Sequence, residues 1–131
     1  MTFRKLAFGL AVLVQMSGMA LADGDATKGE QVSRKCMACH DFAKATNKTG
    51  PHLIGVIGRP VASVEGFKYS EAMTAYAGKV PVWDEAALGI YLENPRAVVV
   101  GTRMSFAGLK KVDERTDLIA YLKSIARQVS P

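Results

Sequence analysis

The chain has 131 residues, with 17 basic and 12 acidic side chains and two cysteines. This length fits one small domain, and the modest positive charge, with no basic run interleaved with aromatic residues, excludes a nucleic-acid-binding protein. After residue 22 no apolar segment is long enough to span a membrane.

The first 22 residues have the organisation of a secretory signal peptide. Arg4 and Lys5 precede an apolar run, residues 6–14, and small residues at 20–22 come before the polar Asp23. Cleavage near Ala22 leaves a single mature domain, residues 23–131, with 15 basic and 12 acidic side chains and therefore a net charge of +3. The alternative is a retained membrane anchor, since the stretch approaches the length of a spanning helix.

The first helix of the mature chain is predicted to begin after Asp25, an N-cap residue, and to run through Lys35 into the sequence CMACH at residues 36–40. CxxCH is the spacing that attaches a c-type haem. The two thiols add to the porphyrin as thioethers, and His40 follows them, placed to bring an imidazole nitrogen to the iron. We therefore expect one covalent haem c, bound through Cys36 and Cys39.

Three other kinds of cysteine site have less support. A thioredoxin-like redox site needs a βαβ pattern, and no alternating strand pattern flanks the motif. A zinc site would have to use Cys36, Cys39, His40 and His52, which are all the cysteines and histidines in the chain, without a paired second half. A structural disulfide would leave the position of His40 unexplained.

The rest of the mature chain is predicted to be all-α with long irregular connections. Glycines and prolines indicate a loop over residues 50–60. A serine can cap a short helix over residues 71–76, and Asp84 suits the start of another helix that ends before Asn94-Pro95. The last helix is the clearest, because apolar residues recur at helical spacing from residue 113 to about 127.

A haem held by His40 needs a sixth ligand or an open position. Three methionines remain in the mature chain, and Met104 is the best candidate because its loop is free to cross to the opposite face of the ring. Met73 falls in a short helix, where a methionine is more often core filler, and Met37 lies inside the attachment loop. His52 is the alternative, giving two imidazoles and a lower potential.

Further residues complete a pattern that covers the whole mature chain. They are Lys48-Thr49-Gly50-Pro51, Gly55, Gly58-Arg59, Gly66-Phe67, Tyr69, Trp83, residues 91–95, Gly101-Thr102, Met104, Phe106-Ala107-Gly108 and residues 117–123. With this pattern the chain resembles the bacterial class I cytochromes c of the cytochrome c2 type, relatives of mitochondrial cytochrome c. The resemblance implies a small cytochrome c fold, in which the N- and C-terminal helices cross and three or so shorter helices and long loops wrap around the haem.

The resemblance also implies roles for individual residues. His40 would be the proximal ligand, with the Pro51 carbonyl on its other ring nitrogen, and Met104 the distal ligand. Tyr69 and Trp83 would donate hydrogen bonds to a buried haem propionate, whose charge Arg59 would offset, as a desolvated carboxylate requires. Tyr91 would lie near the Met104 sulfur, and Gly29 would let the last helix pack closely against the first.

The function implied is a soluble, monomeric, periplasmic one-electron carrier and not an enzyme, because iron with both axial positions filled has no place for a substrate. Its partners would be redox proteins: a quinol-oxidising cytochrome bc complex as donor and a terminal oxidase or photosynthetic reaction centre as acceptor. Basic residues would steer weak, salt-dependent docking. The candidates are Lys44, Lys48, Lys68, Lys79, Arg96, Arg103, Lys110 and Lys111. The alternative class is a haem enzyme or sensor in which Met104 is labile and the iron binds peroxide or a diatomic gas.

Three departures from the family pattern carry their own expectations. Ser33 stands where relatives usually have a helix-packing phenylalanine, so the first and last helices should pack more loosely or use a neighbouring valine. Met73 replaces an asparagine often found near the haem, which predicts a less polar pocket. Arg96 and Arg103 flank the Met104 loop where relatives often carry lysines, so loss of methionine ligation at high pH should recruit a more distant lysine or be delayed.

Overall fold

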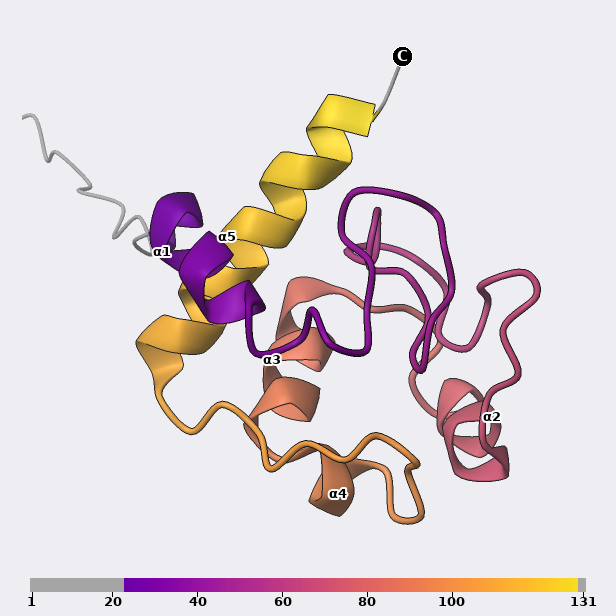
Figure 1. Cartoon of the computed structure of the whole chain (residues 1–131). Helices are drawn as coiled ribbons and strands as arrows, with labels where there is room; N and C mark the ends of the chain where they lie inside the picture. The colour runs from indigo at the N-terminus through magenta and orange to yellow at the C-terminus, as the bar shows by residue number, and fades with distance from the viewer. Residues whose placement is uncertain (1–22, 130–131) are drawn as a thin grey trace, which may run out of the picture.

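The computed structural model of the chain describes residues 23–129, so the predicted signal peptide lies outside the described residues. In this part of the chain the fold is all-α, as predicted, with no strand and one isolated bridge between Pro60 and Val82. The helices are α1 (Ala26–Ser33), α2 (Glu71–Ala77), α3 (Glu85–Glu93), α4 (Pro95–Val98) and α5 (Val112–Val129). Figure 1 shows α1 crossing α5, with α3 beside them, while α2 and the long loops form the other side of the molecule. None of the described helices is long and apolar enough to cross a membrane.

Three helices begin at the capping residues that the sequence indicated. The Asp25 carboxylate accepts hydrogen bonds from the Thr27 and Lys28 amides, and the side chains of Ser70 and Asp84 cap α2 and α3 in the same way. The predicted extent of the first helix is wrong by two residues at its end, because α1 stops at Ser33. Beyond it the Cys36 amide bonds to the Ser33 carbonyl at 2.8 Å, a tighter turn that leads into the CMACH sequence.

The break at Asn94-Pro95 ends α3 as predicted, but it also starts the one-turn helix α4, which the sequence analysis did not include. Asn94 caps α4 by accepting from the Ala97 amide at 3.3 Å. Pro95 occupies the first turn, where its missing N–H would have no intrahelical partner in any case. A proline that stops one helix can therefore open the next.

Helices α1 and α5 are in close contact at Gly29, which is buried. A Cβ at this position would overlap the Asp117 carbonyl and lie 2.8 Å from the Tyr121 Cβ. The Asp25 amide donates to the Asp117 carboxylate at 2.7 Å, and Lys35 pairs with Glu114 at 2.9 Å. Only a glycine lets the two backbones approach this closely.

Ser33, where the resemblance implies an aromatic residue, has its contacts within its own helix and the core. Ser33 is fully buried, and its hydroxyl donates to the Glu30 carbonyl at 2.7 Å. Val32 packs against the core, which is one of the two expected outcomes. Phe42, from the loop after CMACH, places its ring centroid 6.1 Å from that of Tyr121. The aromatic contact with α5 therefore comes from a loop residue.

The hydrophobic core joins α3 and α5 to the loops around the CMACH sequence. Its buried members are Phe42, Val56, Val61, Trp83, Leu88, Tyr91, Leu92, Val99, Leu109, Leu118, Ile119, Leu122 and Ile125. Cys36, Met73, Met104 and Phe106 pack against this core while remaining partly exposed. Of the residues predicted to surround the cofactor, Cys36 and Met104 thus lie at the edge of the core, whereas Trp83 and Tyr91 belong to it.

Candidate functional site

The loop after CMACH holds the ring of His40 in a fixed orientation. His40 Nδ1 donates to the Pro51 carbonyl oxygen at 2.7 Å, and the Gly50 amide bonds to the Cys39 carbonyl at 2.8 Å. A Cβ at Gly50 would lie 2.7 Å from His40 Nδ1, so this position has room only for glycine. With Nδ1 carrying the proton, the lone pair of Nε2 is free to bind a metal ion.

Burial shifts the pKa values of His40 and Cys36 at this site. Burial lowers the pKa of His40, the hydrogen bond to Pro51 opposes that shift, and the charges of Arg59 and Lys48 add to it. The neutral imidazole is the form that coordinates metals. Burial raises the pKa of the Cys36 thiol.

Two of the three alternative cysteine sites, the disulfide and the zinc site, are not supported within residues 23–129. Cys36 and Cys39 are both free, so they do not form a disulfide. No group of three or more His, Cys, Asp or Glu side chains in that part of the chain is arranged to hold a metal ion, which argues against the zinc alternative.

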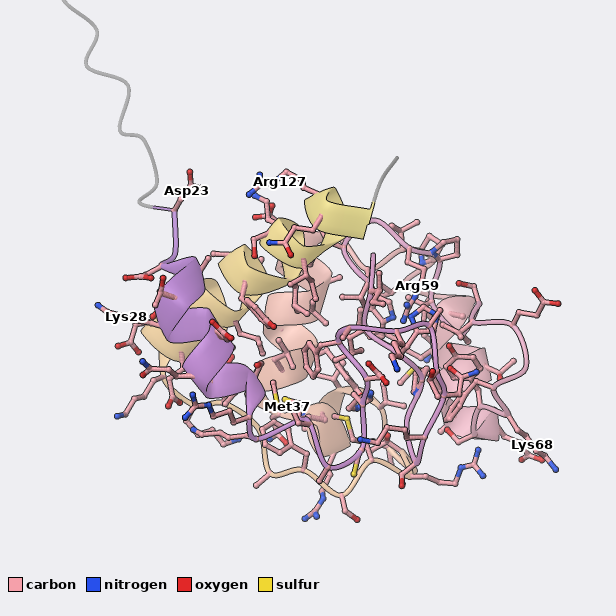
Figure 2. The ribbon with its side chains drawn as sticks, turned by 45° about the horizontal axis from the view of Figure 1, so that its top comes forward. Asp23, Lys28, Met37, Arg59, Lys68 and Arg127 are labelled. Atoms are coloured by element: carbon pink, nitrogen blue, oxygen red, sulfur yellow. The ribbon has the colours of Figure 1, made fainter. Side chains whose placement is uncertain are left out.

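Arg59, Tyr69 and Trp83, the residues predicted to surround a propionate, lie together. The Trp83 amide bonds to the Arg59 carbonyl at 2.9 Å, and Tyr69 is close enough to influence the pKa of Arg59, which burial lowers. Arg59 donates to the carbonyls of His52 and Ile54 at 3.0 and 3.4 Å. Figure 2 shows Arg59 within the fold and not at its rim.

This half-buried guanidinium forms no salt bridge within the described chain, so it can accommodate an anion. Tyr69 accepts from the Val64 amide at 3.1 Å, and its own O–H remains able to donate.

Met104 lies in the loop after α4, and its contacts come from that loop and from α3. The Tyr91 hydroxyl points at Met104 Sδ, 3.9 Å away, as the resemblance implied. Tyr91 is 5% exposed, and burial raises its pKa while a hydrogen bond to the Thr102 side chain opposes that shift. Thr102 Oγ1 also accepts from the Met104 amide at 3.3 Å. The thioether is therefore positioned by polar contacts at both its sulfur and its backbone.

The remaining candidate ligands have other surroundings. Met73 packs against the core, and Met37 is exposed. His52 belongs to the loop that holds the His40 ring, since its amide bonds to the Asn47 side chain and its carbonyl accepts from Arg59. Its Nδ1 is buried and has no hydrogen-bond partner among residues 23–129.

Several contacts that hold the site together have no sequence signature. Asn47 donates to the Glu65 carbonyl at 3.1 Å and accepts from the His52 amide, which joins two loops. Lys48 donates to the Met37 carbonyl within CMACH at 2.7 Å. Arg103, next to Met104, donates to the Lys68 carbonyl at 2.6 Å. In each contact a backbone atom is one partner, so no pattern of residue types could have predicted the pairing.

The described residues fit a covalent haem. The donor set consists of two free thiols at CxxC spacing and an imidazole whose Nε2 is available, with a thioether held on a separate element. The uncompensated Arg59 suits the negative charge of a propionate. No hydrogen bond within residues 23–129 joins His40 to Met104.

Comparison with known proteins gives a consistent picture. No protein-family model matches the chain. It is 43% identical over 121 residues to cytochrome c2 of Blastochloris viridis, a match that covers 92% of each chain. It is 49% identical over 109 residues to cytochrome cy of Rhodobacter capsulatus, with 82% of this chain covered, but it spans only 53% of the length of that relative.

A solved structure agrees with these sequence relatives. Cytochrome cH from Methylobacterium extorquens superposes with a TM-score of 0.70 at 38% identity, covering 77% of this chain and 99% of the other. The chain therefore belongs to the class I cytochromes c of the cytochrome c2 type, electron-transfer proteins that carry one haem c, bound here through Cys36 and Cys39.

Proposed function

We propose that this electron carrier works in the periplasm as a monomer, with its haem ligated by His40 and Met104. The observation that carries the proposal is that two candidate ligands, on separate segments of the chain, are each held in position by hydrogen bonds. Pro51 orients the His40 ring and leaves Nε2 free, while Tyr91 and Thr102 position the Met104 thioether. When bound, the haem supplies the Fe(III)/Fe(II) couple.

The surrounding residues would adjust that couple in two ways. A methionine sulfur favours Fe(II) more than a second imidazole would, so a positive potential is expected. Tyr69, Trp83 and Arg59 would hold one propionate by hydrogen bonds and charge, which keeps a buried carboxylate ionised. Both features support rapid one-electron exchange without bond chemistry.

Partners would be redox proteins, with a quinol-oxidising cytochrome bc complex as donor and a terminal oxidase or photosynthetic reaction centre as acceptor. The eight basic residues named as docking candidates are all exposed. Figure 2 shows one of them, Lys68, extending outward beside α2. Exposed charges steer encounter but are screened by salt, so docking should weaken as ionic strength rises.

The test of ligation is the visible spectrum of the purified, haem-loaded protein. Oxidised wild-type protein should show the weak far-red band that reports methionine sulfur on Fe(III), and reduced protein should not bind CO at neutral pH. Met104→Ala should lose the band and bind CO, whereas Met37→Ala, a matched methionine variant at an exposed position, should retain the wild-type spectrum. A band that persists in Met104→Ala would refute the assignment, and CO binding by the wild type would favour the sensor or enzyme alternative.

A further inference from the structure

The side chain of Lys48 is bound to the haem attachment sequence itself. Its Nζ donates to the carbonyl of Met37, which lies between the two cysteines, at 2.7 Å. Two more hydrogen bonds, from the Gly50 amide and from the His40 ring, join the same two segments of the chain. Lys48 therefore makes a third link between CMACH and the loop that holds the His40 ring.

We propose that Lys48 is a positioning residue of the haem site, which caps the turn that carries both thiols and His40 and raises the reduction potential through its charge. The inference rests on the proposed ligation by His40 and Met104. It is separate from a docking role, because it acts within the free protein and not in a complex with a redox partner.

The capping follows from the geometry of the CMACH turn. The amides of Cys39 and His40 both bond to the Cys36 carbonyl, at 3.1 and 3.0 Å, so this segment forms a helical turn after α1. The last carbonyls of such a turn have no partner within it and carry partial negative charge. No backbone amide of residues 23–129 bonds to the Met37 carbonyl. A lysine ammonium satisfies a carbonyl of this kind by both hydrogen bonding and charge.

The charge of Lys48 is not cancelled by its hydrogen-bond partner. Three other cations of the described chain, Lys35, Arg115 and Lys123, each pair with a carboxylate, whereas Lys48 binds a neutral carbonyl. Burial is the main cause that lowers the pKa of His40, and the charge of Lys48 is one of the smaller causes, so this charge acts at the ring. A positive charge there disfavours Fe(III) relative to Fe(II), which raises the potential.

Lys44 supplies a matched control four residues earlier in the chain. Both lysines are exposed. Both act on Asp41, whose pKa is lowered mainly by hydrogen bonds from the Lys44 and Ala43 amides and to a smaller extent by the charges of Lys48 and Lys44. The Lys44 charge, however, is not among the causes that shift the pKa of His40. Its ammonium group makes no hydrogen bond or salt bridge in the part of the chain that the structure describes.

Hydrogen exchange measured by NMR on the haem-loaded Fe(II) protein tests the capping contact. In Lys48→Met the Gly50 amide and the His40 ring N–H should exchange about two- to tenfold faster, the effect of losing one hydrogen bond. The Trp83 amide, which bonds outside this contact, should keep its rate and so excludes a general loss of stability. Lys48→Arg should restore most of the protection, because a guanidinium also donates to a carbonyl. Lys44→Met should exchange like the wild type.

The midpoint potential, measured at low and high ionic strength, tests the charge effect. Lys48→Met should lower the potential at both, because its charge is held directly against the attachment turn. The smaller effect of Lys44→Met should disappear at high salt, where an exposed charge is screened. Unchanged Gly50 exchange in Lys48→Met, or equal potentials of Lys48→Met and Lys44→Met at high salt, would overturn the proposal.

The wild type provides a measurement that does not depend on any variant. The ammonium protons of Lys48 should exchange more slowly with water than those of Lys44, and equal rates would also overturn the proposal. The far-red methionine band is recorded on every sample. Its absence from the wild type would show that the proposed ligation has failed, whereas its presence together with an overturning result would show that only the role of Lys48 has failed.

Discussion

The contact between α1 and α5 at Gly29 predicts opposite effects for two glycine-to-alanine substitutions. Alanine normally stabilises a helix interior by about 1 kcal/mol relative to glycine. At Gly29, however, the added Cβ would lie 2.5 Å from the Asp117 carbonyl carbon, whereas ordinary contact begins at 3.4 Å. The helices would have to separate by at least about 0.9 Å, the difference between these two distances, because the carbonyl oxygen lies closer still.

That separation has a second cost. It would stretch the hydrogen bond from the Asp25 amide to Asp117 from 2.7 Å to beyond hydrogen-bonding distance. Overpacking typically costs about 1–3 kcal/mol, and losing the hydrogen bond costs about 0.5–1.5 kcal/mol. After the gain in helix propensity, Gly29→Ala should lower the free energy of unfolding by about 0.5–3.5 kcal/mol.

Gly89 in α3 supplies the control. A Cβ there would meet Ile119 Cδ1 at 3.9 Å, an ordinary contact. Gly89→Ala should therefore raise the free energy of unfolding by about 0.5–1 kcal/mol. Urea denaturation of the haem-loaded proteins, followed by far-ultraviolet circular dichroism, measures both. The reasoning fails if Gly29→Ala is as stable as the wild type, or if both variants change stability in the same direction.

Three further predictions concern the haem pocket and its response to pH. Met73→Asn should lower the midpoint potential in a redox titration, because a polar amide near the haem favours the extra charge of Fe(III), and an unchanged or higher potential would contradict the less polar pocket. Loss of Met104 ligation at high pH should recruit Lys79 or Lys110 or be delayed, because Arg103 stays protonated. To bind the iron, the Lys110 side chain must first leave the Glu93 carbonyl, 2.8 Å away. The pH transition, followed at the far-red band, should change in Lys110→Ala or Lys79→Ala. A transition that begins at the pH usual for lysine-bearing relatives and is unaltered in both variants would contradict this prediction. Burial lowers the pKa of His52 from its ordinary 6.5, so the unfolded chain binds the proton more readily and stability should fall as pH drops from 6.5 toward the folded-state pKa. His52→Gln should reduce that slope in urea denaturation, and an unchanged slope would exclude His52 as its source.

Local features of the site could be predicted from the sequence because they depend on neighbouring residues. The spacing of Cys36, Cys39 and His40 is fixed by their positions along the chain, so it indicates the haem without any knowledge of the fold. The helix starts at Asp25, Ser70 and Asp84 depend on hydrogen bonds that reach only two or three residues along the chain. Met104 was indicated by its place in a loop, whereas the roles of Pro51, Tyr69, Trp83 and Arg59 came from the resemblance to a family; all of these roles remain proposals.

Other features were decided only by the tertiary structure, because they join residues far apart in the sequence. Phe42, in the loop after CMACH, places its ring against that of Tyr121 in α5, 79 residues along the chain. Arg103 secures the Met104 loop through a backbone carbonyl 35 residues away, and a carbonyl has no residue type that a sequence could reveal. Tyr76 looks like an ordinary residue of a short helix until the fold places its ring against Trp83 and Tyr91. The sequence by itself thus determined the cofactor and the helix starts, which depend on local chemistry, whereas the long-range packing of rings and carbonyls required the complete fold.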